Sequence, residues 1–271
     1  MNLINIIEEI EKVDADVYER ISPRRRAMKS FFNMGSKIAI AAVPLSLGTM
    51  LKKAYGQTPS KIIDVLNFAL TLEHLEYRFY VMGVEKVKIP SGCDADSIKT
   101  IRADELKHVK FLQTVITSLG GTPVAEAKYD FTAKGTFPTV FSDYATFLAV
   151  AQALEDTGVR AYKGQAGNVM ESNEVLTAAL RIHSVEARHA SHIRWMRQQM
   201  GVDVKPWITG NQSGIGPAVN ANYAGEETDT QAGIVITNIN GKDIPFAAAT
   251  ESFDEPLTKE QVVAIVTPFF A

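Results

Sequence analysis

Apolar residues recur every three or four positions in four long stretches of the chain, which is the spacing of one buried helix face. In the first stretch, residues 58–86, the apolar series runs from Ile62 through Leu66 to Phe79. Three more stretches have the same spacing and cover residues 94–119, 142–169 and 173–201. The pattern therefore predicts an all-α protein with four long helices.

The lengths of the connections predict how these helices are ordered. Short turns, among them Ile89–Gly92, join the first helix to the second and the third to the fourth, so each pair is expected to be antiparallel. Residues 120–141 join the two pairs, and about 20 extended residues reach roughly 70 Å. A helix of about 30 residues is only about 45 Å long. The sequence therefore predicts a four-helix bundle, residues 57–203, with one long crossover connection.

Residues 1–56 have the pattern of an export signal. Arg24, Arg25 and Arg26 precede an apolar run, residues 38–50, which is shorter than the ~20 residues of a membrane-spanning helix. Paired arginines before such a run resemble a twin-arginine signal. This predicts an exported, periplasmic protein without a stable membrane span. The alternative is an N-terminal helix that stays attached to the bundle of a cytoplasmic protein.

The composition changes after the fourth helix, in residues 204–271, of which residues 207–235 are rich in glycine, asparagine, threonine and alanine. Asn240-Gly241 is a strong turn signal and predicts a short β-hairpin with strands at 233–237 and 244–246. Thr258 is expected to begin a short terminal helix. We interpret this segment as a C-terminal extension that wraps the bundle.

A duplicated motif is superimposed on the helical pattern. The first copy has Leu72-Glu73, Arg78, Tyr80 and, about one helical hairpin later, Glu105-Leu106-Lys107-His108. The second copy has Leu154-Glu155, Arg160, Tyr162 and then Glu186-Ala187-Arg188-His189. Each copy is therefore a lone glutamate on one helix and a Glu-x-x-His pair on the next.

The residue types and spacing of this motif predict a site for two metal ions. Glu-x-x-His places both side chains on one helix face, and burying carboxylates without a cation is very costly. Oxygen ligands with some imidazole suit iron, manganese or zinc. The expected ligands are Glu73, Glu105, His108, Glu155, Glu186 and His189. Glu105 and Glu186 are the expected bridging carboxylates, whereas any single member taken alone would more often be a surface residue.

Other residues near the motif carry weaker signals. Tyr80 and Tyr162 follow the lone glutamates by nearly two helical turns, so they are expected either to bond near the site, in a second layer around it, or to pack in the core. Glu76 is a candidate for a further ligand, although its counterpart in the second copy is Gly158. The motif arginines are expected to contact bundle carboxylates or solvent.

Charge and cysteine content exclude several functions. The net charge is −3, which argues against nucleic acid as a main partner. Cys93 is the only cysteine, so one chain can form no disulfide and no thiolate-based zinc or iron–sulfur site.

The motif and the helix order resemble the ferritin-like superfamily, in particular the exported ferritin-like domain family that includes desiccation-related proteins. The resemblance covers residues 58–201 and Phe253–Thr258. It implies that the six residues above bind two iron ions, or manganese or zinc, and that dioxygen or peroxide is the small-molecule substrate of an oxidase-type or peroxidase-type enzyme. The alternative is a metal-poor bundle with a structural or stress-protective role. Such bundles often dimerise, but nothing in the sequence specifies a homodimer.

Overall fold

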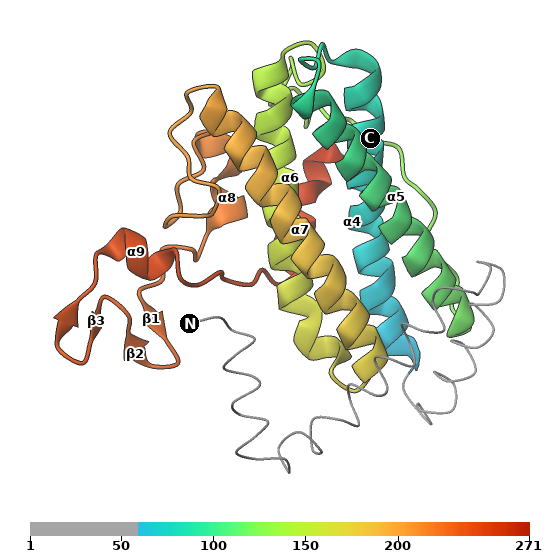
Figure 1. Ribbon diagram of the computed structural model, residues 1–271. Helices are drawn as coiled ribbons and strands as arrows, with labels where there is room; N and C mark the ends of the chain where they lie inside the picture. The colour runs from blue at the N-terminus through green and yellow to red at the C-terminus, as the bar shows by residue number, and fades with distance from the viewer. Residues whose placement is uncertain (1–58) are drawn as a thin grey trace, which may run out of the picture. The chain divides into compact units, whose positions relative to one another are not determined.

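Four long helices form the bundle in the computed structural model, which describes residues 59–271 (Figure 1). The predicted signal segment, residues 1–56, lies outside the described residues. The helices are α4 (Pro59–Lys86), α5 (Cys93–Ser118), α6 (Tyr144–Ala166), which continues into the 3-10 turn η1 (Gly167–Val169), and α7 (Asn173–Gln199). The predicted all-α class and the four helices are therefore confirmed.

Local sequence explains where the helices begin. The side chain of Asp143 accepts a hydrogen bond from the backbone N–H of Thr146 at the start of α6, and Ser172 does the same for Val175 at the start of α7. These caps satisfy backbone donors that a helix terminus otherwise leaves free. Gly92, which precedes α5, has a φ of 96°, a conformation that favours glycine.

The helices pack as two pairs, α4 with α5 and α6 with α7. A long connection leads from the end of α5 to the start of α6, and its side chains Phe131 and Val140 are buried in the main core. Phe79 of α4 stacks on Phe147 of α6, with ring centroids 4.9 Å apart, and joins the two pairs. The arrangement is the expected four-helix bundle with one long crossover.

The C-terminal extension consists of short elements. They are η2 (Pro217–Val219), α8 (Asn220–Tyr223), β1 (Thr230–Gln231), β2 (Ile234–Val235), β3 (Asn238–Ile239), β4 (Lys242–Asp243), α9 (Phe246–Thr250), α10 (Lys259–Val266) and η3 (Thr267–Phe269). Both α8 and α10 pack against α6. Thr258 begins α10 as predicted, because its hydroxyl and the side chain of Gln261 cap each other's backbone N–H.

The extension contains two hairpins rather than the one predicted. β3 and β4 pair with Asn238 opposite Asp243, around the predicted Asn240-Gly241 turn. β1 and β2 pair around a second turn, Ala232-Gly233, in which both residues have positive φ. The strands expected at 233–237 and 244–246 are therefore shorter and displaced. The sequence did not reveal the second turn because alanine rarely adopts positive φ.

The end of the chain pairs with the crossover. The N–H of Asp130 donates to the carbonyl of Phe269 at 2.8 Å, and the N–H of Ala271 donates to the carbonyl of Lys128 at 3.1 Å. The extension thus returns to the connection that precedes α6.

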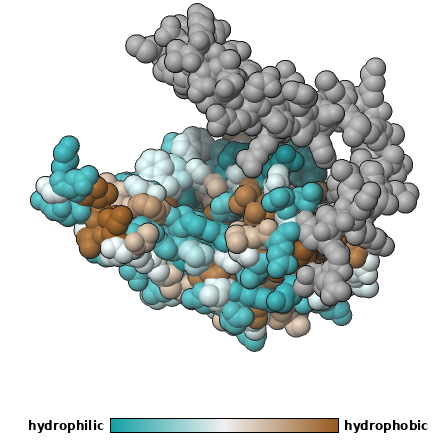
Figure 2. Space-filling model, turned by 90° about the horizontal axis from the view of Figure 1, so that it is seen from below, coloured by the Kyte–Doolittle hydropathy of each residue, from teal (hydrophilic) through white to brown (hydrophobic). Residues whose placement is uncertain are grey.

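Several apolar side chains of the extension face solvent. Ile234, Val235, Ile239 and Phe246 are exposed, and apolar surface gathers over this part of the molecule at the left of Figure 2.

Among the described helices, none has the length and apolar character needed to cross a membrane.

Candidate metal centre

Six side chains meet inside the bundle, and they come from all four long helices. Glu73 comes from α4 and Glu155 from α6, while α5 supplies Glu105 with His108 and α7 supplies Glu186 with His189. The four glutamates are fully buried, and both histidines are less than a tenth exposed. The structure therefore brings together all six of the ligands that the duplicated motif predicted.

The six residues form two overlapping groups. In the first group, ligand atoms of Glu73, Glu105, His108 and Glu186 all lie within 4.8 Å of one another. In the second group, the same holds for Glu105, Glu155, Glu186 and His189. Glu105 and Glu186 belong to both groups. Two neighbouring cations with two shared carboxylates would fit this arrangement.

Buried carboxylate oxygens that lack a hydrogen bond of normal geometry test whether the centre suits cations. Within the described part of the chain, both oxygens of Glu186, Oε1 of Glu105 and Oε2 of Glu155 make no hydrogen bond of normal geometry. A buried polar atom of this kind costs about 1–3 kcal/mol, and more when it is charged. Metal coordination would remove that cost, so the donor set fits divalent or trivalent cations.

The two imidazoles lie among the carboxylates. Nδ1 of His108 is 3.0 Å from Oε1 of Glu186 and 3.1 Å from Oε2 of Glu73. Nδ1 of His189 is 2.8 Å from Oε1 of Glu105. Burial lowers the pKa of both histidines, but the surrounding carboxylates outweigh it, so the pKa of His108 is raised and that of His189 is raised to about 11.

The pKa values of the carboxylates differ from one another when no cation is bound. Burial raises the pKa of Glu105 to about 7, against the opposing effect of its hydrogen bond with His108. Burial, followed by the charge of Glu105, raises the pKa of Glu186. Burial also opposes ionisation of Glu73, but hydrogen bonding and charge from His108 hold its pKa below the usual value. Protons therefore occupy positions that a cation would need.

The two tyrosines of the motif bond across the two copies. The hydroxyl of Tyr80 donates to Oε1 of Glu155 at 2.5 Å, and the hydroxyl of Tyr162 donates to Oε1 of Glu73. Both tyrosines are buried, and burial together with the neighbouring glutamate charge raises the pKa of each hydroxyl. Each tyrosine therefore contacts the site, but through the glutamate of the other copy rather than its own.

Asp104 is a neighbour of the centre that the sequence did not indicate. Its Oδ2 lies 3.5 Å from Nε2 of His189, the imidazole nitrogen that faces away from the carboxylate group. A carboxylate in this position orients a ligand histidine. The corresponding residue of the second copy is Val185, so comparing the two copies could not reveal this role.

Two more buried residues belong to the region of the motif, and one of them, Arg160, departs from the sequence expectation. Glu76 is buried, and burial followed by the charge of Glu186 raises its pKa well above the usual value. Arg160 was expected to contact bundle carboxylates or solvent. Instead it is fully buried against the extension, where its Nε lies 2.8 Å from Oε1 of Glu226.

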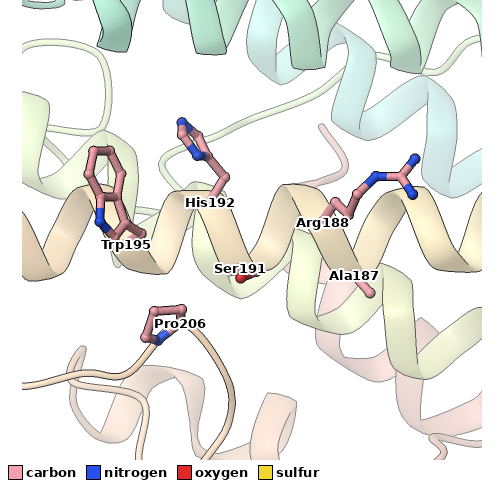
Figure 3. A pocket seen from close by; sticks show the side chains of 6 residues that line it. All are labelled: Ala187, Arg188, Ser191, His192, Trp195 and Pro206. Carbon is pink, nitrogen blue, oxygen red and sulfur yellow. The ribbon is translucent and has the colours of Figure 1, made fainter. Parts of the chain in front are cut away.

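A surface hollow of about 470 Å³ lies beside α7 (Figure 3). Its lining consists of Ala187, Arg188, Ser191, His192, Trp195 and Pro206. None of the six candidate ligands is among these residues, although His189 is only one helical turn from His192. The hollow is therefore separate from the carboxylate groups.

Comparison with known proteins agrees with this architecture. Residues 61–199 match the family model of the ferritin-like domain. The match begins at the third residue of α4 and ends with the last residue of α7, so it covers nearly all of the bundle and all six candidate ligands. No curated protein matches the chain.

Proposed function

This chain belongs to the ferritin-like domain family, and from that premise we propose that it binds two metal ions, with iron as the preferred element and manganese or zinc as substitutes. The observation that carries the proposal is the set of buried carboxylate oxygens that make no hydrogen bond of normal geometry, in two groups that share Glu105 and Glu186. Such oxygens are costly in an empty interior and favourable around cations.

In the proposed centre the side chains serve two positions. Glu73 and His108 would hold one ion, Glu155 and His189 the other, and Glu105 with Glu186 would lie between them. The hydroxyls of Tyr80 and Tyr162 hold Glu155 and Glu73 in fixed orientations. The fully buried carboxylates exclude bulk water from the centre.

Bound iron or manganese would supply electron transfer to dioxygen or peroxide, which makes the proposed activity that of an oxidoreductase, such as iron oxidation or peroxide reduction, whereas zinc would not support it. Around them, the protein provides groups that can hold protons. Glu105, with a pKa of about 7, changes its protonation near neutral pH, and both imidazoles lie within hydrogen-bond distance of it. Fold alone does not select one reaction among these, so the reaction class rests on the site.

The same contacts support a second candidate, a metal-poor bundle with a structural or stress-protective role. Protonated His108 and His189 partly neutralise the buried carboxylates, since their raised pKa values keep both charged at neutral pH. In this case protons would replace the cations, and the centre would serve the stability of the bundle alone.

Metal analysis separates the two candidates. The protein is expressed in iron-rich medium, washed, and measured for metal content and optical absorption. About two irons per chain, lost in Glu105→Ala but retained in the matched surface variant Glu85→Ala on the exposed side of α4, would support the proposed centre. Less than about a tenth of an iron per chain would favour the structural role.

We also propose that residues 1–56 direct export to the periplasm and are then removed. The support is the arginine run before the short apolar segment. Mass spectrometry of the protein purified from its own host tests this. A mature chain that begins near Gly56 is expected, and an intact Met1 would show instead that the segment is retained.

A further inference from the structure

Glu76 lies at the candidate centre without belonging to either group of four. It follows Glu73 by three residues on α4, so both side chains leave the same face of the helix. Its side chain is buried, with 3% of the residue exposed. A buried acid one turn from an expected ligand needs a role or a partner.

Two carboxylates converge on the space above Gly158 of α6. If Gly158 carried a Cβ atom, that atom would lie 2.9 Å from Oε1 of Glu76 and 3.7 Å from Oε2 of Glu186. The missing side chain of Gly158 therefore makes room for the Glu76 carboxylate. Oε2 of Glu186, one of the converging atoms, has no hydrogen bond of normal geometry within the described chain.

The duplication makes this feature asymmetric. Gly158 follows Glu155 by three residues, just as Glu76 follows Glu73. The first copy thus supplies a carboxylate where the second supplies no side chain. The two copies contribute the same residues to the candidate centre except at this position, where only the first copy has a fifth buried glutamate, Glu76.

The surroundings of the two oxygens of Glu186 indicate which of the two metal positions lies nearer to Glu76. Oε1 lies 3.0 Å from Nδ1 of His108. Oε2 is the oxygen that faces Gly158, and it lies 3.9 Å from Nδ1 of His189. Gly158 itself is one helical turn from Glu155. Glu76 therefore approaches the group that contains Glu155 and His189.

We propose that Glu76 is a further metal ligand, which binds the ion held by Glu155 and His189 and makes this position bind cations more tightly than the other. The inference rests on the proposed two-metal function. With Glu76 added, the position of Glu155 and His189 would have four carboxylates and one imidazole, whereas the position of Glu73 and His108 would have three carboxylates and one imidazole. The additional negative charge favours the cation electrostatically.

Titration of the metal-free full-length chain with Co(II) under anaerobic conditions tests the inference, with visible absorption and calorimetry as readouts. The wild type is expected to bind two ions with unequal affinities. Glu76→Gln keeps the side-chain volume and removes the charge, and it is expected to weaken the tighter position about 10–100-fold while leaving the weaker one within about twofold. The absorption of the first ion should change as well, because its ligand set changes.

Matched variants separate ligation from a packing effect. Gly158→Ala presses on the Glu76 carboxylate and is expected to weaken the same position, while Glu76→Asp keeps the charge and is expected to retain part of the affinity. Glu85→Gln, exposed on the same helix, should leave both positions unchanged. Thermal melting of each metal-free variant confirms that it is folded.

Three results would overturn the inference. Unchanged Co(II) affinities in Glu76→Gln would show that Glu76 is not a ligand, and so would an equal weakening of both positions. In either case, loss of both positions in Glu105→Gln would still support the two-metal proposal. A wild-type chain that binds no Co(II) would remove the proposed function and this inference together.

Discussion

The hydroxyl of Tyr80 on α4 donates a hydrogen bond to Oε1 of Glu155 on α6, at 2.5 Å. Tyr162 on α6 makes the reciprocal bond to Glu73 on α4. Each copy of the duplicated motif therefore orients the lone glutamate of the other. Neither copy could assemble the candidate centre by itself, because its own glutamate would lack the hydroxyl that fixes it.

Removal of one hydroxyl should weaken metal binding without unfolding the bundle. In Tyr80→Phe, Glu155 loses its hydrogen-bond donor, and we expect metal affinity to fall about 10–100-fold, the usual effect of losing a partner behind a ligand. Co(II) titration measures the change. The control is Tyr144→Phe, which removes a similar hydroxyl–carboxylate bond, 2.9 Å to Asp94, outside the six-residue centre. Equal affinities for the Tyr80→Phe protein and the wild type would contradict the orienting role.

Metal binding should release protons and strengthen as the pH rises. Without a cation, Glu105 has a pKa of about 7 and His189 a pKa of about 11, so at neutral pH the imidazole and part of the carboxylate population hold protons. A ligand must lose its proton to bind a cation. Calorimetry between pH 6 and pH 8, in buffers with different ionisation enthalpies, measures the proton count. Binding that is independent of pH and of the buffer would disprove this linkage.

Arg160 should be essential for holding the extension on the bundle. It is fully buried, pairs with Glu226, and donates to the backbone carbonyls of Asn222, Ala224 and Glu255. Arg160→Met would leave the buried Glu226 charge unpaired, so we expect a loss of about 3–5 kcal/mol in the free energy of unfolding. Limited proteolysis should then cleave the extension faster.

The repeat provides a matched control for Arg160. Its counterpart Arg78 pairs with Glu126, 2.5 Å away on the crossover, and the side chains of this pair are 41% and 29% exposed. An exposed pair contributes about 0–1 kcal/mol, so Arg78→Met should change the unfolding midpoint in urea only slightly. Similar losses in the two variants would argue against the proposed anchoring by Arg160.

Gly164 should be required where the extension crosses α6. A Cβ on this residue would lie 1.9 Å from the backbone carbonyl oxygen of Leu257. Gly164→Ala must displace the segment around Leu257, and we expect the free energy of unfolding to fall by about 1–3 kcal/mol. Thermal unfolding measures this change. Gly167→Ala is the control, since a Cβ there meets nothing within 4 Å and its φ is −61°. It should be neutral or slightly stabilising.

Periodicity was sufficient to predict the helices, because amphipathic spacing and end signals act locally. Asp143, Ser172 and Thr258 each cap a helix where the sequence placed a start. The six residues of the centre could also be predicted as a set, since the same spacing occurs twice. Their role as metal ligands stays a proposal.

Contacts between segments far apart in the chain could not be predicted in the same way. Arg160 meets Glu226 and the extension only after the fold has formed, and no local pattern marks that pairing. The crossed tyrosine bonds depend on α4 and α6 lying opposite each other. The sequence indicated Glu76 as a candidate for a further ligand, but it could not predict the approach of Glu76 to Glu186, which depends on the space above Gly158.

The hydrogen bonds that join Lys128 to Ala271 and Asp130 to Phe269 have a topological consequence. They close residues 128–271 into a non-covalent ring that contains α6, α7 and the whole extension. The entropic cost of closing a ring rises only slowly with its length, so a short seam reinforced by the contact of Tyr129 with Phe270 can keep it shut. Residues 269–271 therefore cannot detach without also exposing residues 128–130 of the crossover.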